Sequence, residues 1–184
     1  MPFNLVRVVI YIFAILLLGC HDEKANSLFH SLRGLDEVEI RLSKYNLDSV
    51  PPEIGELKGV KKLFISKDSA QGWTSYPPLS ALDEIRERPP YRYLPNELTE
   101  LTSLQSLTLI DLDLVTLPEN LDKLQSLDTL VLFMNKLTMS KEVAKLKTLK
   151  RLRYLGIIGN KVTADDLAQL KQSNPGLHID ADIR

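Results

Sequence analysis

The feature that most constrains the fold is a pattern of apolar residues that recurs about every 23 residues along most of the chain. Leu104 opens one copy of this pattern and Leu127 opens the next, 23 residues later. The same step separates Ile40 from Leu63 upstream, and the copies are rich in leucine, which makes up 35 of the 184 residues. One copy is too short to bury its own apolar side, so successive copies must stack on one another.

Each copy begins with an L-x-L segment, in which apolar residues alternate with others. This alternation predicts a short strand that buries one face. Apolar residues spaced by three or four follow, in the segment that leads from one strand back to the start of the next. Pro51, Pro95 and Pro118 lie in this segment, where no backbone N–H is needed for hydrogen bonding in the sheet. The predicted fold class is an α/β solenoid, a short curved rod with one parallel β-sheet on its concave face.

The pattern resembles the leucine-rich repeat family, of the kind with a Leu-Pro pair inside the repeat, here Leu117-Pro118. The resemblance covers most of residues 37–180 and implies a protein-recognition scaffold without a cofactor. It also implies an asparagine after each strand that binds loop backbone, as at Asn135 and Asn160. We place Tyr45, Asp68 and Leu112 at the matching positions of other copies, so we expect re-shaped turns there.

The two ends of the repeat array also carry a pattern. Apolar residues at helical spacing predict a capping element over residues 26–35, and they are Leu28, Phe29, Leu32 and Leu35. Leu177 and Ile179 indicate a final half repeat. We expect a helix over residues 164–172 with two acidic residues in its first turn, and we interpret the lysines of residues 141–153 as a solvated convex face.

The array is interrupted between Val60 and Leu104, which open consecutive clear copies but lie 44 residues apart. A degenerate repeat would place Glu87 at a buried strand position, where an unpaired carboxylate is costly, and Pro89-Pro90 would end the strand. We therefore favour an inserted loop over about residues 68–93. Its Trp73 and Tyr76 either pack on the edge of the solenoid or contribute to a partner site.

In each predicted strand, the residues that alternate with the buried ones face outward and define the concave face. With Ile40 and Leu42 placed level with Leu63 and Ile65, the outward positions carry several large apolar side chains: Phe64, Ile110, Val131, Phe133, Tyr154 and Ile158. A contiguous exposed apolar patch usually marks an interaction site. Three interpretations stay open: a partner binds the patch, the inserted loop covers it, or β-propensity alone put these residues there.

Residues 1–19 have the features of a secretory signal peptide, because Arg7 precedes an apolar run of only eleven residues. The run ends in the segment LLGC, which resembles the lipobox of bacterial lipoproteins. The resemblance implies lipid attachment at Cys20 and an extracytoplasmic position on the cell membrane, with His21 favouring the outer membrane. The alternative is an ordinary cleaved signal with a coincidental cysteine.

Other chemistry is poorly supported. The formal net charge of −1 argues against a nucleic-acid partner, and no nucleophile elbow, dinucleotide fingerprint or phosphate-binding loop is present. We found no sign of a metal site or a small-molecule substrate. The chain is thus predicted to have a signal peptide (1–19), a lipidated tether and cap (20–36) and a repeat domain (37–184). We predict that it binds an unidentified protein partner and is not an enzyme. The alternative is a structural envelope protein without a specific ligand.

A Cys20→Ala substitution tests the predicted anchor. It removes the thiol that would carry the lipid, so we expect the protein to move from the membrane fraction to the soluble fraction. Cell fractionation with labelled palmitate measures both effects. Retention of the variant in the membrane, together with no label on the wild type, would contradict the lipoprotein prediction.

Overall fold

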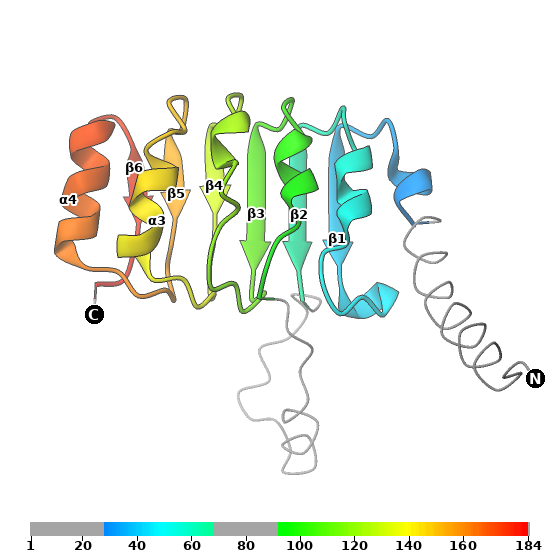
Figure 1. The fold of residues 1–184 in the computed structure, drawn as a ribbon, viewed down its shortest axis with the longest axis horizontal. Coiled ribbons are helices and arrows are strands. Elements are labelled where there is room, and N and C mark those ends of the chain that lie inside the picture. Colours follow the sequence, from blue (N-terminus) through cyan, green and yellow to red (C-terminus); the bar gives the residue numbers. More distant parts are fainter. Residues whose placement is uncertain (1–27, 68–91, 184) are drawn as a thin grey trace, which may run out of the picture.

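A computed structural model describes residues 28–67 and 92–183 of the chain. Its strands form one six-stranded parallel sheet in chain order (Figure 1). The strands are β1 (Glu37–Arg41), β2 (Lys62–Ser66), β3 (Ser106–Ile110), β4 (Thr129–Val131), β5 (Tyr154–Gly156) and β6 (His178–Asp180). Leu107 pairs with Leu130, and Leu130 pairs with Leu155. The inward leucines therefore line up from strand to strand, which confirms the predicted leucine-rich repeat solenoid.

Short helices return the chain along the other side of the sheet (Figure 1). Four are 3₁₀ helices: η1 (Ser43–Tyr45), η2 (Pro52–Glu56), η3 (Asn96–Glu100) and η4 (Leu121–Lys123). Pro51 and Pro95 stand in extended conformation immediately before η2 and η3, where a fixed φ and a missing N–H cost nothing. The last two coils instead carry α-helices, α3 (Met139–Leu146) and α4 (Ala164–Ser173).

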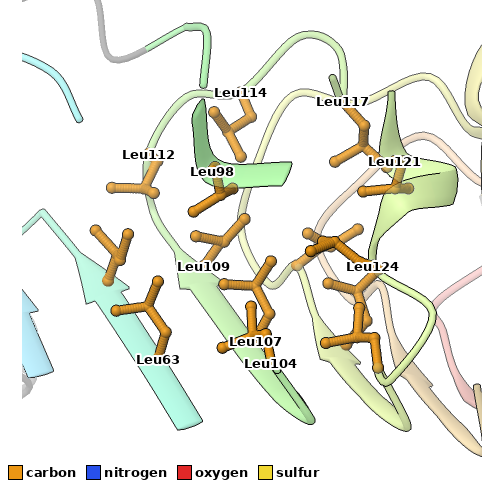
Figure 2. Close-up of a cluster of buried hydrophobic side chains, with 14 of the residues drawn as sticks. Leu63, Leu98, Leu104, Leu107, Leu109, Leu112, Leu114, Leu117, Leu121 and Leu124 are labelled. Carbon is orange, nitrogen blue, oxygen red and sulfur yellow. The ribbon is translucent and has the colours of Figure 1, made fainter. Parts of the chain in front are cut away.

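Leucines from the strands and from the return path fill the space between the two sides (Figure 2). Leu107 and Leu109 reach it from β3, whereas Leu98 and Leu121 reach it from η3 and η4, and each is no more than 2% exposed. Burial of a leucine side chain stabilises a fold by about 1.5–3 kcal/mol. The core is continuous from coil to coil, so the coils stabilise one another.

Two buried asparagines join neighbouring coils by hydrogen bonds. The Asn135 Oδ1 atom accepts hydrogen bonds from the backbone N–H groups of Leu112 and Leu114, at 3.1 and 3.3 Å. Its Nδ2 donates to the carbonyl of Leu109 at 3.0 Å. Asn160 repeats the arrangement one coil later, where its Oδ1 accepts from the Leu137 N–H at 3.1 Å. The role predicted for the two asparagines is confirmed.

The predicted register of the first coil is wrong by two residues. Ile40 pairs with Ile65 rather than with Leu63, and Val38 pairs with Leu63. The position equivalent to Asn135 is consequently Ser43 and not Tyr45. A shift of two residues leaves each side chain on its predicted face, and Leu42 is also fully buried, so the apolar pattern alone did not distinguish the two registers.

The turn that contains Leu112 is re-shaped, as predicted. Leu112 is buried in the core, and both of its neighbours, Asp111 and Asp113, have positive φ angles of 53° and 52°. Aspartate tolerates this left-handed conformation better than most residues. In this coil, the buried side chain of Leu112 occupies the position that asparagine holds in the next two coils.

One lysine of residues 141–153 is not solvated as predicted. The Lys145 side chain is 13% exposed and bridges Glu119 and the buried Glu142 at 2.8 and 3.2 Å. Glu142 also accepts the Leu117 N–H at 3.0 Å, which ties α3 to the preceding coil. Burial by itself lowers the pKa of Lys145, but the hydrogen bonds to Glu119 and Glu142 outweigh burial, and the pKa is raised.

The helix predicted over residues 164–172 is present as α4. Thr163 and Asp166 form a capping box at its start, with the Thr163 side chain accepting the Asp166 N–H at 3.2 Å and the Asp166 carboxylate accepting the Thr163 N–H at 2.9 Å. Reciprocal capping satisfies two N–H groups that an isolated helix end leaves open. Asp166 therefore has a bonding role in addition to its favourable charge.

The sheet leaves no place for a further strand between β2 and β3, because the two are directly paired. The alternative of a degenerate repeat with its own strand at this point is excluded. Trp73 and Tyr76 of the predicted loop lie outside the described residues.

At the N-terminal end of the repeat array, residues 28–32 are helical and Phe29 is fully buried. Leu28 and Leu32 pack against the core, whereas Leu35, which we placed in the same apolar set, is 46% exposed. Within residues 28–67 and 92–183, no helix is long and apolar enough to cross a membrane.

Replacement of Asn135 by alanine tests the link between coils. The substitution leaves two buried N–H groups without an acceptor, so we expect a loss of about 2–4 kcal/mol in the free energy of unfolding. Urea denaturation measures the loss. Asn120→Ala is the matched control, because Asn120 is exposed and its side chain caps nothing; an equal loss in both variants would contradict the assigned role.

Candidate partner-binding face

The outward side chains form three rows across the concave face of the sheet. The register places Tyr154 in the first row, beside Thr129 and His178, and places Phe64 and Val131 in the second. The third row contains Ile110, Phe133 and Ile158, the last two lying just beyond the ends of β4 and β5. All six predicted residues among the described ones therefore lie on one face.

Backbone hydrogen bonds continue past the strand ends and hold the third row together. The Asp111 N–H donates to the Phe133 carbonyl at 3.2 Å, and the Met134 N–H donates to the Ile158 carbonyl at 2.9 Å. Ile158 is 42% exposed and Met134 is 52% exposed, which is high for large apolar side chains. We call Ile110, Phe133, Met134 and Ile158 the apolar row.

The Phe133 ring lies against β5 because its neighbour Gly156 has no side chain. A Cβ atom on Gly156 would stand only 2.5 Å from Cε1 of the Phe133 ring. The ring is therefore packed against the backbone of β5, and it is half-buried rather than freely exposed. Its position is fixed before any partner arrives, which lowers the entropy cost of binding.

A polar cluster borders the apolar side chains at the last strand. The Tyr154 hydroxyl donates to Oδ2 of Asp180 at 2.5 Å, and Nε2 of His178 lies 3.1 Å from Oδ1 of the same carboxylate. The rings of Tyr154 and His178 are stacked with their centroids 5.6 Å apart. The hydrogen bond to Asp180, burial and the carboxylate charge all raise the pKa of Tyr154, so the phenol stays protonated at neutral pH and remains a donor.

The first two strands present charge instead. Lys62 pairs with Glu37 at 2.5 Å, and Arg41 pairs with Glu39 at 2.7 Å. The hydrogen bond to Glu37 and its charge raise the pKa of Lys62. Phe64 lies beside these pairs in a shallow hollow of the face. The concave face is thus charged at β1 and β2, whereas its apolar side chains gather at the carboxyl ends of β3 to β5, next to the polar outward residues Ser106, Thr108 and Thr129.

Among residues 28–67 and 92–183, no group of histidine, cysteine and acidic side chains is arranged to hold a metal ion. The predicted lipid site at Cys20 and the predicted aromatic residues Trp73 and Tyr76 lie outside the described residues.

Sequence reasoning did not predict the cluster of Tyr154, Asp180 and His178. The register makes Tyr154 and His178 lateral neighbours, and Asp180 lies two residues further along β6, beside Gly156. Equal position within the repeat identifies Tyr154 and His178 as neighbours, whereas the bond of Tyr154 to Asp180 is diagonal across the register.

Comparisons with known proteins find similar chains among solved structures at low sequence identity. No protein family model and no curated protein matches the chain. Among solved structures, a leucine-rich repeat protein of Leptospira interrogans is 23% identical with a TM-score of 0.46, and the match covers 73% of this chain and 34% of that one. Internalin C2 of Listeria monocytogenes is 22% identical with a TM-score of 0.43, covering 72% of this chain and 48% of that one.

A third solved structure is the plant peptide hormone receptor RGFR1 in complex with RGF2. It is 16% identical with a TM-score of 0.40, and the match covers 80% of this chain and 26% of the receptor. The chain thus spans less than half the length of each of these three proteins. The class of fold is that of a leucine-rich repeat solenoid, as the sheet of this chain itself shows.

A Gly156→Ala substitution tests the packing of Phe133. The added methyl group must displace the ring or strain the strand, so we expect a loss of about 1–3 kcal/mol in the free energy of unfolding. The double variant Gly156→Ala with Phe133→Ala should lose less than the sum of the two single changes. Gly59→Ala is the control, because a Cβ there meets nothing within 4 Å; strict additivity in thermal unfolding would contradict the contact.

Proposed function

We propose that the chain is a lipid-anchored extracytoplasmic leucine-rich repeat protein that binds a protein partner through the C-terminal half of its concave face. The observation that carries the proposal is the apolar row, whose side chains are partly exposed and come from neighbouring coils that backbone hydrogen bonds join. Contiguous exposed apolar surface is unusual on a soluble domain and marks interaction sites. Phe133 and Tyr154 are the expected anchors, because aromatic side chains contribute large contact area at low entropy cost.

The proposed anchor rests on sequence reasoning alone. The apolar run and the LLGC segment support export and a lipid on Cys20, and His21 supports the outer membrane. Multiple acyl chains on one residue suffice for stable attachment. A tethered solenoid of this kind would present its concave face to other proteins of the cell envelope.

The partner site is tested by site-directed photo-cross-linking in the cells that produce the protein. A photoreactive phenylalanine analogue at Ile158, which is exposed, should give one specific adduct, identified by mass spectrometry. Phe133→Asp together with Tyr154→Ala should abolish it, because the anchors and the apolar surface are lost.

The control for this experiment is Thr102→Asp, which adds one negative charge at an exposed position outside the sheet. Thermal unfolding of all variants shows whether the fold is kept. The proposal is contradicted if the double variant folds and forms the same adducts as the wild type. A diffuse set of adducts, equal in all variants, would favour a structural envelope protein without a specific ligand.

A further inference from the structure

A basic hollow lies where the chain enters the last two strands. It is lined by Lys150, Arg151 and Arg153 from the turn before β5, and by Asn174 and Gly176 from the turn before β6. A Cβ on Gly176 would meet only Asn174 Oδ1, at 3.8 Å. The missing side chain therefore leaves the hollow open to solvent.

The three cations of this hollow are not neutralised within the described part of the chain. None of them forms an ion pair there. By contrast, Lys61, which directly precedes β2 as Arg153 directly precedes β5, pairs with Asp36 of the neighbouring coil at 2.8 Å. The neighbour of Arg153 in register is Asp128, since Tyr154 pairs with Thr129. The Asp128 carboxylate instead accepts the Thr129 hydroxyl at 2.7 Å. Asp128 also lines the hollow, so three positive charges face one carboxylate there and the hollow keeps an excess of positive charge.

An apolar crevice adjoins the basic hollow between α3 and α4, which lie side by side (Figure 1). Leu146, Leu149 and Leu170 line it, and it shares Lys150, Leu152 and Asn174 with the hollow. The crevice has a volume of about 130 Å³. The three leucines are no more than 3% exposed, and the polar residues Lys147 and Ser173 also line the crevice. The crevice and the basic hollow are continuous at this rim of the solenoid.

We propose that this rim binds an anionic phosphate group, with Arg151, Arg153 and Lys150 as its ligands, and that the phosphate belongs to an amphiphile whose first methylene groups enter the crevice. Guanidinium groups match phosphate oxygens with paired hydrogen bonds. Clustered cations attract anionic lipid surfaces. The apolar crevice distinguishes a phospholipid from a free phosphate, because only a lipid supplies both parts.

The test is an NMR titration of the full chain in a neutral detergent free of phosphate, following the amide signals of Lys150 and Gly176. The probes are dihexanoyl phosphatidylglycerol, dihexanoyl phosphatidylcholine and glycerol phosphate. We expect the phosphatidylglycerol to bind most tightly. Arg151→Gln with Arg153→Gln should weaken it by about tenfold or more, because each basic residue near an anionic headgroup contributes substantially to binding.

The matched control is Lys141→Gln with Lys161→Gln, which removes two exposed charges elsewhere and should change binding by less than about threefold. Equal binding of glycerol phosphate and phosphatidylglycerol would keep the phosphate site but overturn the lipid. Absent shifts at Lys150 and Gly176, or equal weakening by both double variants, would overturn the site. These outcomes are independent of the concave face, since none of the substitutions touches it.

Discussion

The structure depends on the sharing of one apolar interior between coils that have none of their own. The parallel ladder holds adjacent strands about 4.8 Å apart, so Leu107, Leu130 and Leu155 stack in line and each is covered by its neighbours. Asn135 and Asn160 satisfy backbone groups of the preceding coil from inside that interior. Buried and outward residues alternate along each strand, so the stacking of the buried residues also sets which outward residues are neighbours on the surface.

This regularity produces surfaces of different character on one small rod. The concave face changes from the ion pairs of β1 and β2 to the apolar row at the ends of β3 to β5. The rim before β5 and β6 carries three cations that form no ion pair with any described residue, next to the crevice between α3 and α4. The absence of a side chain matters on both surfaces. Gly156 lets Phe133 lie against the sheet, and Gly176 leaves the basic hollow open. A partner and an anionic amphiphile would therefore contact separate parts of the molecule.

The fold and the candidate face were largely predictable, because repetition translates sequence phase directly into position. Phe64, Ile110, Val131, Phe133, Tyr154 and Ile158 lie on one face as predicted. The register of β1 was not predictable, since Val38, Ile40 and Leu42 are all inward and all apolar. The burial of Lys145 was also missed, because it depends on Glu119 and Glu142 reaching the same point from different coils.

By itself, the sequence determined the class of fold and the inward or outward direction of each strand residue, because both depend only on local period and on the need of each coil for a neighbour. The tertiary structure decided which side chains meet across coils. The bond of Tyr154 to Asp180 and the contact of α3 with α4 each join residues from separate stretches of the chain. Such contacts depend on the pairing register and on side-chain directions, and a pattern read along one chain contains neither.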